Sequence, residues 1–153
     1  MGDTSIGIGI DLRERKKETL MLAESRERLK KAQEMAQVGS WELDLESDRL
    51  TWSDETFRIF GFEPQCFKPV FGDFLKRVHP QDRKSVKKAY DSSIAEGRDG
   101  YEIEHRIIRE TTGEVRIVRE KCEHVRDSEG GIIRSIGMVQ DLTEVKRLQD
   151  YLA

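Results

Sequence analysis

The sequence has little cysteine and no long apolar run. Its 153 residues include only two cysteines, Cys66 and Cys122, with neither metal-site nor CxxC spacing, so neither a disulfide framework nor a metal site is expected. No apolar stretch approaches the roughly eighteen residues of a membrane-spanning helix, and no signal peptide opens the chain. We therefore expect reduced thiols, no membrane contact by this segment and a cytoplasmic location.

Positive charge is not in excess either. The net charge is −3, and both signs are mixed along the chain, so no basic stripe is present for a phosphate backbone and no nucleic-acid partner is expected. The chain also lacks a G-x-S-x-G, an H-E-x-x-H and a Walker loop. We expect that this segment is not itself an enzyme.

What the sequence does contain is a repeat, at residues 5–16 and again at residues 135–146. Both copies read Ser-Ile-Gly, an apolar stretch and then Asp-Leu-x-Glu-x-Lys. An Asp followed three residues later by Glu is typical of a capping box, in which each side chain bonds a free N–H group at the start of a helix. A strand should therefore end, and a helix begin, at each copy. The predicted capping residues, which we also expect to transmit signals, are Asp11, Glu14, Asp141 and Glu144.

The 130-residue spacing of the two copies suits one domain plus a connecting helix and is too long for a solenoid repeat. It predicts a unit cut from a tandem array. Residues 1–10 would be the remnant of the last strand of an upstream unit, and residues 11–37 a linking helix. Residues 38–141 would form the domain itself, and residues 142–153 the start of an output helix.

The linking helix, predicted over residues 12–37, carries an apolar stripe. Leu22, Leu29 and Ala36 recur every seven residues, a pattern that favours a short coiled coil with a second copy of the chain. An amphipathic helix lying on its own domain explains the same stripe. Both readings stay open from the sequence, and the first predicts a homodimer.

The remaining chain reads as an α+β domain. A hairpin is followed by several helices and then by three strands whose side chains alternate, joined by Gly-containing turns. The expected elements are strands 40–45 and 50–52, a helix that Ser53 or Asp54 caps and Gly61 stops, a helix over 73–78, a helix that starts between residues 80 and 82 and runs to 96, and strands 101–108, 115–125 and 132–140.

These signals, in this order, resemble the PAS domain of bacterial and archaeal multi-domain signalling proteins, specifically its sensory-box type with a C-terminal PAC motif. The resemblance covers residues 38–145 and implies a five-stranded antiparallel sheet of order 2-1-5-4-3, with helices on one face and a long N-terminal helix on the other. It also makes residues 1–10 the tail of an upstream PAS unit. The matching pieces are V-G-S-W-E-L-D (38–44), T-W-S-D-E-T-F-R-I-F-G-F-E-P (51–64), V-H-P-Q-D-R (78–83), Y-E-I-E-H-R-I-I-R (101–109), T-G-E-V-R-I-V (112–118), V-R-D-S-E-G (125–130) and I-G-M-V-Q-D-L-T-E-V-K (136–146).

The resemblance also implies a pocket between sheet and helices, which in some members holds haem, flavin or a small metabolite. Sequence alone does not separate a filled core from a cavity. No cofactor is predicted, and an unidentified small molecule stays a candidate ligand. The residues expected to line the pocket are Trp52, Phe57, Phe60, Phe71, Phe74, Tyr90, Ile103, His105, Ile117 and Met138.

The cysteine and histidine residues indicate whether a flavin photoadduct or a haem is expected. Light-sensing members carry a reactive Cys within Asn-Cys-Arg-Phe-Leu-Gln, a context that Cys66 lacks, so no photoadduct is expected. Haem needs an imidazole as axial ligand. His79 should lie at a turn and His124 in solvent, whereas His105 points either at the cavity or at the sheet's other face, where a structural hydrogen bond is the favoured reading.

Charged residues should cover the opposite face of the strand that carries His105. Glu102, Glu104 and Arg106 alternate with its apolar residues. Their expected partners on the next strand are Arg116 and Arg119, in exposed cross-strand pairs.

Together these features predict a module that senses a small ligand or relays conformational signals, through its flanking helices, to a C-terminal effector domain. A histidine kinase is the favoured effector and a diguanylate cyclase the second. Two other functions stay open, a ligand-free dimerisation module and a flavin or haem redox sensor.

Overall fold

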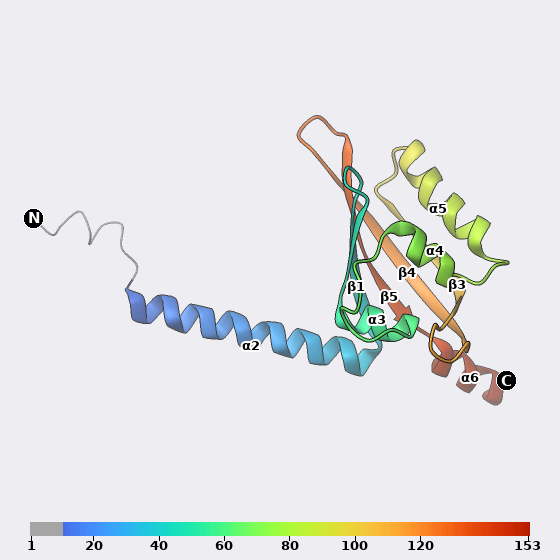
Figure 1. Cartoon of the computed structure of the whole chain (residues 1–153), viewed down its shortest axis with the longest axis horizontal. Helices are drawn as coiled ribbons and strands as arrows, with labels where there is room; N and C mark the ends of the chain where they lie inside the picture. Colours follow the sequence, from blue (N-terminus) through green and yellow to red (C-terminus); the bar gives the residue numbers. More distant parts are fainter. Residues whose placement is uncertain (1–10) are drawn as a thin grey trace, which may run out of the picture.

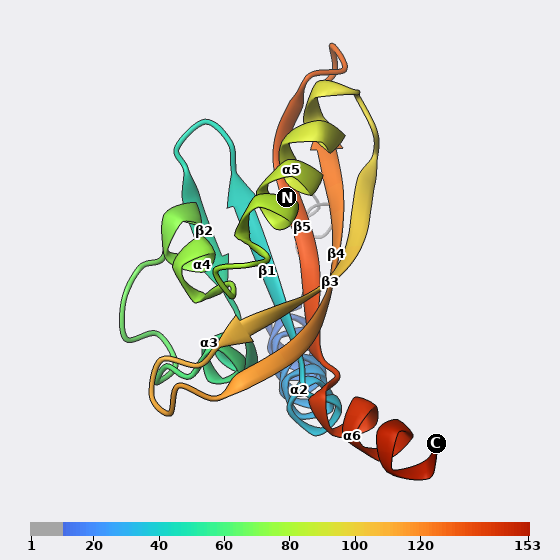
Figure 2. The same ribbon diagram turned by 90° about the vertical axis from the view of Figure 1, so that its right-hand side faces the viewer.

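The computed structural model of the chain describes residues 11–153, and its centre is an antiparallel sheet of five strands in the order β2-β1-β5-β4-β3 (Figure 2). This order confirms the predicted α+β fold. The strands are β1 (Val38–Asp44), β2 (Arg49–Trp52), β3 (Gly100–Ile108), β4 (Val115–Arg126) and β5 (Ile132–Asp141).

Helices α3, α4 and α5 cover one face of the sheet, and helices α2 and α6 both adjoin the end of the sheet where β1 begins and β5 ends (Figures 1 and 2). The aromatic and aliphatic side chains of the inner sheet face and of these three helices form the core. The helices are α2 (Leu12–Ala36), α3 (Asp54–Phe60), α4 (Phe71–Arg77), α5 (Arg83–Ala95) and α6 (Thr143–Leu152).

Local hydrogen bonds set the ends of the covering helices. The Ser53 side chain caps α3, and Gly61 ends it in the left-handed conformation, with φ of 88°. Helix α4 begins two residues before its predicted start, because the carboxylate of Asp73 accepts a hydrogen bond from Val70 N at 2.9 Å and fixes the first turn there.

The outer face of β3 is charged, as predicted, but only part of the predicted pairing forms. Arg119 lies 3.5 Å from Glu102 and 3.1 Å from Glu104. Arg106 pairs instead with Asp82 at the start of α5, at 2.7 Å. The prediction for Arg116 is wrong, because even-numbered residues of β4 face the core side of the sheet.

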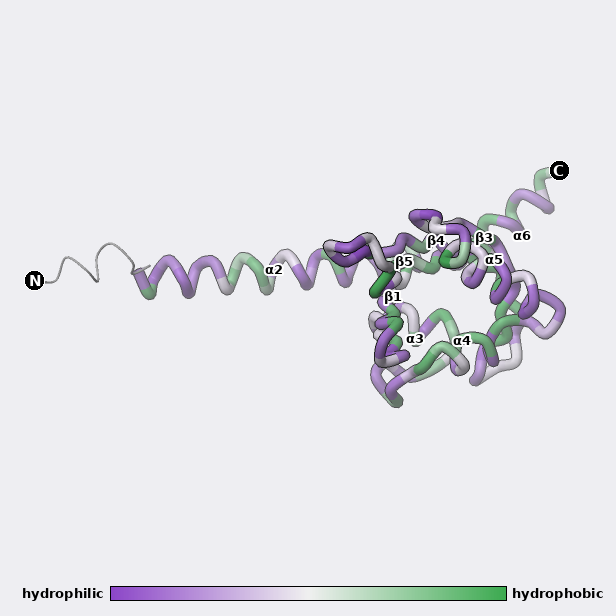
Figure 3. The backbone as a smooth tube through the Cα atoms, turned by 90° about the horizontal axis from the view of Figure 1, so that it is seen from above, coloured by the Kyte–Doolittle hydropathy of each residue, from purple (hydrophilic) through white to green (hydrophobic). Residues whose placement is uncertain are grey.

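Helix α2 extends away from the domain (Figure 1), and none of its residues is buried. Its surface is mostly hydrophilic, with short hydrophobic stretches (Figure 3). Only its C-terminal half contacts the domain through ion pairs, from Lys30 to Asp54 and from Glu34 to Arg58. It ends at Ala36 because Gln37 takes a left-handed conformation, with φ of 54°. The expectation that this helix covers the sheet's other face is therefore wrong.

The strand remnant predicted at residues 1–10 lies outside the described residues. Among residues 11–153, no helix combines the length and the apolar character that crossing a membrane requires.

Candidate functional site: the core cavity and the end of β5

A small cavity lies between the sheet and the helices that cover it. Its volume is about 20 Å³, room for one water molecule, since roughly 10–15 Å³ is the minimum for one. Aromatic rings fill most of the space, with Trp52 and Phe60 stacked at 5.0 Å between centroids. The lining residues are Trp41, Leu43, Leu50, Trp52, Phe60, Phe71, Phe74, Tyr90, Tyr101 and Glu120.

The structure distributes the ten predicted pocket residues between cavity, core and outer surface. Phe57 is fully buried in the core, where its ring meets Trp52 edge-on. Ile103 is half-buried and packs against the core. His105 is buried beside Glu120, a residue that lines the cavity. The predicted residues that do line the cavity are Trp52, Phe60, Phe71, Phe74 and Tyr90.

Ile117 and Met138 do not line the cavity, so that part of the prediction is wrong. Side chains alternate along a strand, and the buried neighbours Val118 and Val139 already define the inner face of β4 and β5. Ile117 and Met138 therefore lie on the outer face, where Met138 is 49% exposed.

Sequence reasoning missed five lining residues, and Glu120 is the informative one. The alternation of β4 gives the signal that could have found it, since Glu120 stands between Val118 and Cys122 on the inward side of the strand. A carboxylate at such a position needs a partner. The other missed residues are Trp41, Leu43, Leu50 and Tyr101.

The partner of Glu120 is His105. Its Nε2 lies 2.8 Å from Glu120 Oε2, with the two side chains 1% and 4% exposed. Burial alone would lower the pKa of His105, but the hydrogen bond and negative charge of Glu120 outweigh burial, and the net result is a raised pKa. The sequence favours a structural, hydrogen-bonded His105, and in the structure both of its ring nitrogens have hydrogen-bond partners.

His124 belongs to a closed ring of hydrogen bonds, so its predicted exposure to solvent is wrong. Ser93 Oγ donates to the carbonyl of Tyr90 at 2.7 Å and hence accepts from His124 Nε2 at 2.8 Å. His124 Nδ1 then accepts from Ser135 Oγ at 2.8 Å, which in turn accepts from the Tyr90 hydroxyl at 3.0 Å. Burial and then the charge of Arg126 lower the pKa of His124, so the ring keeps a neutral imidazole.

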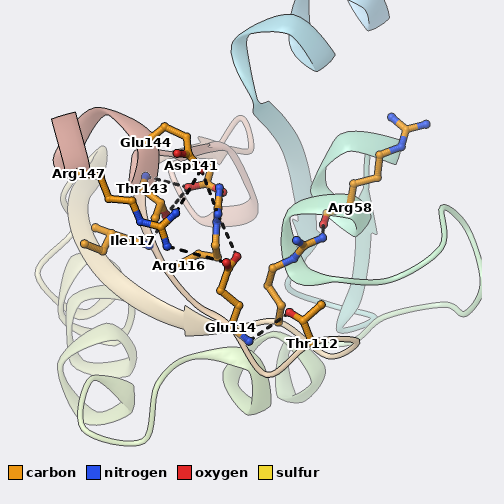
Figure 4. Close-up of polar contacts among 10 residues, drawn as sticks. Arg58, Thr112, Glu114, Arg116, Ile117, Asp141, Thr143, Glu144 and Arg147 are labelled. Carbon is orange, nitrogen blue, oxygen red and sulfur yellow. Dashed lines mark hydrogen bonds and ion pairs between the residues drawn. The ribbon is translucent and has the colours of Figure 1, made fainter.

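A buried polar cluster joins the end of β5 to the start of α6 (Figure 4). Asp141 Oδ2 accepts from Arg116 Nε at 2.8 Å, and Asp141 Oδ1 accepts from the backbone N of Thr143 at 2.9 Å and from its hydroxyl at 2.6 Å. Thr143 Oγ1 accepts from Ile117 N at 2.9 Å. Asp141 thus ends β5, while Leu142 holds the N-cap position of α6, so the predicted cap is one residue too early.

Glu144 does not close a capping box with Asp141. Instead its Oε1 lies 3.3 Å from Arg116 Nη1, which is also 2.9 Å from Glu114 Oε1 (Figure 4). Arg147, one turn further along α6, lies 3.7 Å from Glu144 and 3.9 Å from Glu114. Arg116 thus contacts both Asp141 and Glu144, because the several N–H groups of a guanidinium can bond more than one carboxylate.

The end of β5 also bonds to the end of α2. Asp141 N donates to the carbonyl of Gln37 at 3.0 Å, one residue beyond the last turn of that helix. At the other end of α2, the Asp11 side chain accepts from Arg13 N at 2.9 Å and caps the helix as predicted, with Glu14 in its first turn. Both flanking helices therefore share a contact with one residue of the sheet, Asp141.

The predicted dimer stripe is uncovered in the single chain. Leu29 is 60% exposed and Leu22 53%, and Ala36 is exposed too. The reading in which α2 lies on its own domain therefore fails, and the stripe is free to meet another chain.

The arrangement of sheet, cavity and flanking helices agrees with the family comparison, in which the PAS fold matches residues 49–139. The chain belongs to the PAS family. A crystal structure of a sensory box histidine kinase/response regulator from Burkholderia thailandensis has the same fold, with a TM-score of 0.66, 26% identity and coverage of 82% of this chain and 92% of that one. The segment is thus a PAS sensory domain homologous to the sensor domains of histidine kinases.

Two relatives of this PAS domain are much longer proteins. The blue-light-activated histidine kinase of Brucella ovis is 33% identical over 139 residues, which are 90% of this chain and 27% of the kinase. The probable diguanylate cyclase DgcE of Escherichia coli is 28% identical over 142 residues, which are 93% of this chain and 12% of that protein.

The residues of this PAS domain do not fit a flavin or a haem. A cavity of about 20 Å³ is far below the roughly 300–1,000 Å³ of sites that enclose such ligands. Both ring nitrogens of His105 are engaged, Nδ1 with the carbonyl of Arg106 at 3.1 Å and Nε2 with Glu120, so neither is free to bind iron. Cys66 is exposed, outside the cavity.

Proposed function

We propose that this PAS domain relays conformational signals between α2 and an effector domain that follows α6. One observation carries the proposal: Asp141 bonds both to the end of α2, through Gln37, and to the start of α6, through Thr143. A displacement of β5 must therefore move or break the contacts of both helices. Such coupling between sites is typically worth about 1–3 kcal/mol, or about 5- to 150-fold in an equilibrium.

A histidine kinase is the effector we favour. Among the longer relatives, the histidine kinase is 33% identical to this chain and the diguanylate cyclase 28%. The Burkholderia thailandensis structure with the same fold also comes from a sensory box histidine kinase. We further propose that an upstream PAS unit precedes α2, that β3 to β5 carry the PAC motif and that the protein is cytoplasmic. We also propose a homodimer joined through Leu22, Leu29 and Ala36, because these side chains form an exposed stripe on α2.

A second candidate function is that of a ligand-free dimerisation module of a diguanylate cyclase or related protein. The small cavity favours it over sensing of a large metabolite, because the aromatic side chains already occupy the space such a ligand would need. Isothermal titration with candidate metabolites distinguishes the ligand-free module from one that senses a small ligand, since the ligand-free module should bind none of them in the core.

The relay is tested in the full-length parent protein by substituting Arg116. Arg116→Gln removes the charge that holds Asp141, and we expect basal output, measured as autophosphorylation or as cyclic di-GMP synthesis, to change by about 5- to 150-fold. Arg119→Gln is the matched control, because Arg119 forms only exposed pairs on the outer face of the same strand.

Glu144→Gln extends the test if Arg116→Gln fails to fold. Glu144 is mostly exposed and touches Arg116 from the first turn of α6, so its loss alters the cluster without emptying the core. Output unchanged in both Glu144→Gln and a folded Arg116→Gln would show that α6 is a passive tether.

A further inference from the structure

The hydrogen-bond geometry around His105 and Glu120 requires one shared proton between them. The carbonyl of Arg106 can only accept, so His105 Nδ1, at 3.1 Å, carries a hydrogen. Nε2 and the Glu120 carboxyl, at 2.8 Å, then need one more hydrogen between them. That proton lies on the ring or on the acid, and losing it leaves two acceptors facing each other.

The neighbouring groups do not compete for this proton. Burial, and then the charge of Glu120, raise the pKa of Tyr101, and the same two causes among others raise that of Cys122 to about 12, so both stay neutral. Burial also raises the pKa of Tyr90, which faces the cavity from α5. Asp82, at the start of α5, is engaged with Arg106.

An apolar side chain packs against the imidazole of the pair. The ring of Phe74, from α4, meets the His105 ring edge-on at 5.9 Å between centroids. Phe74 therefore offers no group that could take the proton.

The pair lies close to the output junction. His105 is directly opposite Val118 on β4, and Val118 is directly opposite Asp141 on β5. On the same inward side of β4, Arg116 precedes Val118 and holds Asp141, while Glu120 follows it. A change in the hydrogen bonding of Glu120 thus acts on the strand that holds the junction, four residues from Arg116.

We propose that the buried pair of His105 and Glu120 is a proton-binding site whose occupancy shifts β4 and so biases the Asp141 junction, an inference that rests on the proposed relay. A proton is a ligand that needs no large cavity. Its loss leaves a carboxylate that is 4% exposed beside a neutral ring, a costly arrangement. The adjoining cavity, which Glu120 lines, has room for the one water molecule that would compensate the carboxylate if β4 moved.

The experiment is an NMR titration of the chain from pH 5 to pH 9, following imidazole carbons and backbone amides. His105, assigned through His105→Gln, should titrate with a midpoint above the ordinary value of about 6.5. The amides of residues 141–144 should shift with the same midpoint. In Glu120→Gln, burial acts without the carboxylate, so the midpoint should fall below about 6.5.

His79→Gln is the control, since it removes an imidazole that lies at the turn before α5, and the junction shifts should persist in it. The inference is overturned if His105 does not titrate in this range, or if it titrates while the junction amides stay still. The wild-type titration decides this even if Glu120→Gln unfolds. Failure of the relay itself shows up separately, as unchanged output of the Arg116 and Glu144 variants despite pH-coupled junction shifts.

Discussion

Asp11 and Asp141 occupy matching positions in the two copies of the repeat but have different partners. Asp11 is exposed and caps one helix turn, whereas Asp141 is buried and joins Arg116, Thr143 and, through its backbone, Gln37. A repeat preserves residue type, but the role of a carboxylate depends on the charges that the fold brings to it.

Asp141→Ala should therefore cost more than a helix cap. Losing a cap costs about 0.5–2 kcal/mol, whereas breaking a buried ion pair costs about 3–5 kcal/mol because the remaining charge is left unpaired. We expect about 3 kcal/mol in the free energy of unfolding, since Glu114 still contacts Arg116. Urea unfolding followed by circular dichroism measures this, with Asp11→Ala as the matched control, expected below about 2 kcal/mol. Equal losses in the two variants would contradict the structure.

His124 should make the domain less stable in acid. Its pKa is lowered in the folded state, so its contribution to stability is complete above the unfolded value of about 6.5 and is lost as the pH falls through the lower folded value. Protonation would turn Nδ1 into a donor and leave the Ser135 hydroxyl without its acceptor.

This prediction is measured by urea unfolding at pH 7.5 and pH 5.5. His124→Gln should remove this part of the acid loss, whereas His79→Gln should retain it. His105 contributes with the opposite sign, since its pKa is raised: its share is complete below about pH 6.5 and is lost as the pH rises through the folded value. A wild-type acid loss that persists in His124→Gln would assign it to another group.

At the scale of strands, Gly137 sets how closely β5 packs with its neighbours. A Cβ at this position would collide with the backbone oxygen of Lys121 on β4 and with the indole of Trp41 on β1. The glycine of the Ser-Ile-Gly motif is thus required in the second copy, because it leaves room for the Trp41 ring.

Gly137→Ala should lower the free energy of unfolding by about 1–3 kcal/mol, the usual cost of overpacking. Gly72→Ala is the control, because a Cβ there, in the first turn of α4, meets nothing within 4 Å and alanine favours a helix. Thermal unfolding of both variants measures the difference. A stable Gly137→Ala would mean that Trp41 can move away without cost.

At the scale of the whole molecule, the exposed stripe on α2 should join two chains. Leu29→Glu places a charge in the centre of the stripe and should convert dimers to monomers in light scattering, while the circular dichroism of the domain persists. Leu20→Glu is the matched control, since Leu20 is 64% exposed but lies two residues from Leu22, on the far side of the helix. Dimers that survive Leu29→Glu would place the interface elsewhere.

Much of the fold could be predicted from the sequence because its signals are local. Alternating side chains and glycine turns gave the last three strands, the charged helix was found from residue 12 onward, and ordered motifs gave the strand order through a family resemblance. The site was less predictable. Trp52, Phe60 and Phe74 line the cavity, but Met138 does not, because the sequence does not state which of two alternating faces the helices cover.

What the sequence determined by itself is therefore the set of elements, their order and the Asp-x-x-Glu motif at the exit of the last strand. The roles of the buried polar residues depend on the tertiary structure. Pairings between β3 and β4 bring Glu120 to His105, and Arg116 on β4 binds the second carboxylate oxygen of Asp141, whose first oxygen bonds Thr143 at the helix start. Long-range strand register decides both, since a buried charge bonds whichever partner the neighbouring strand presents.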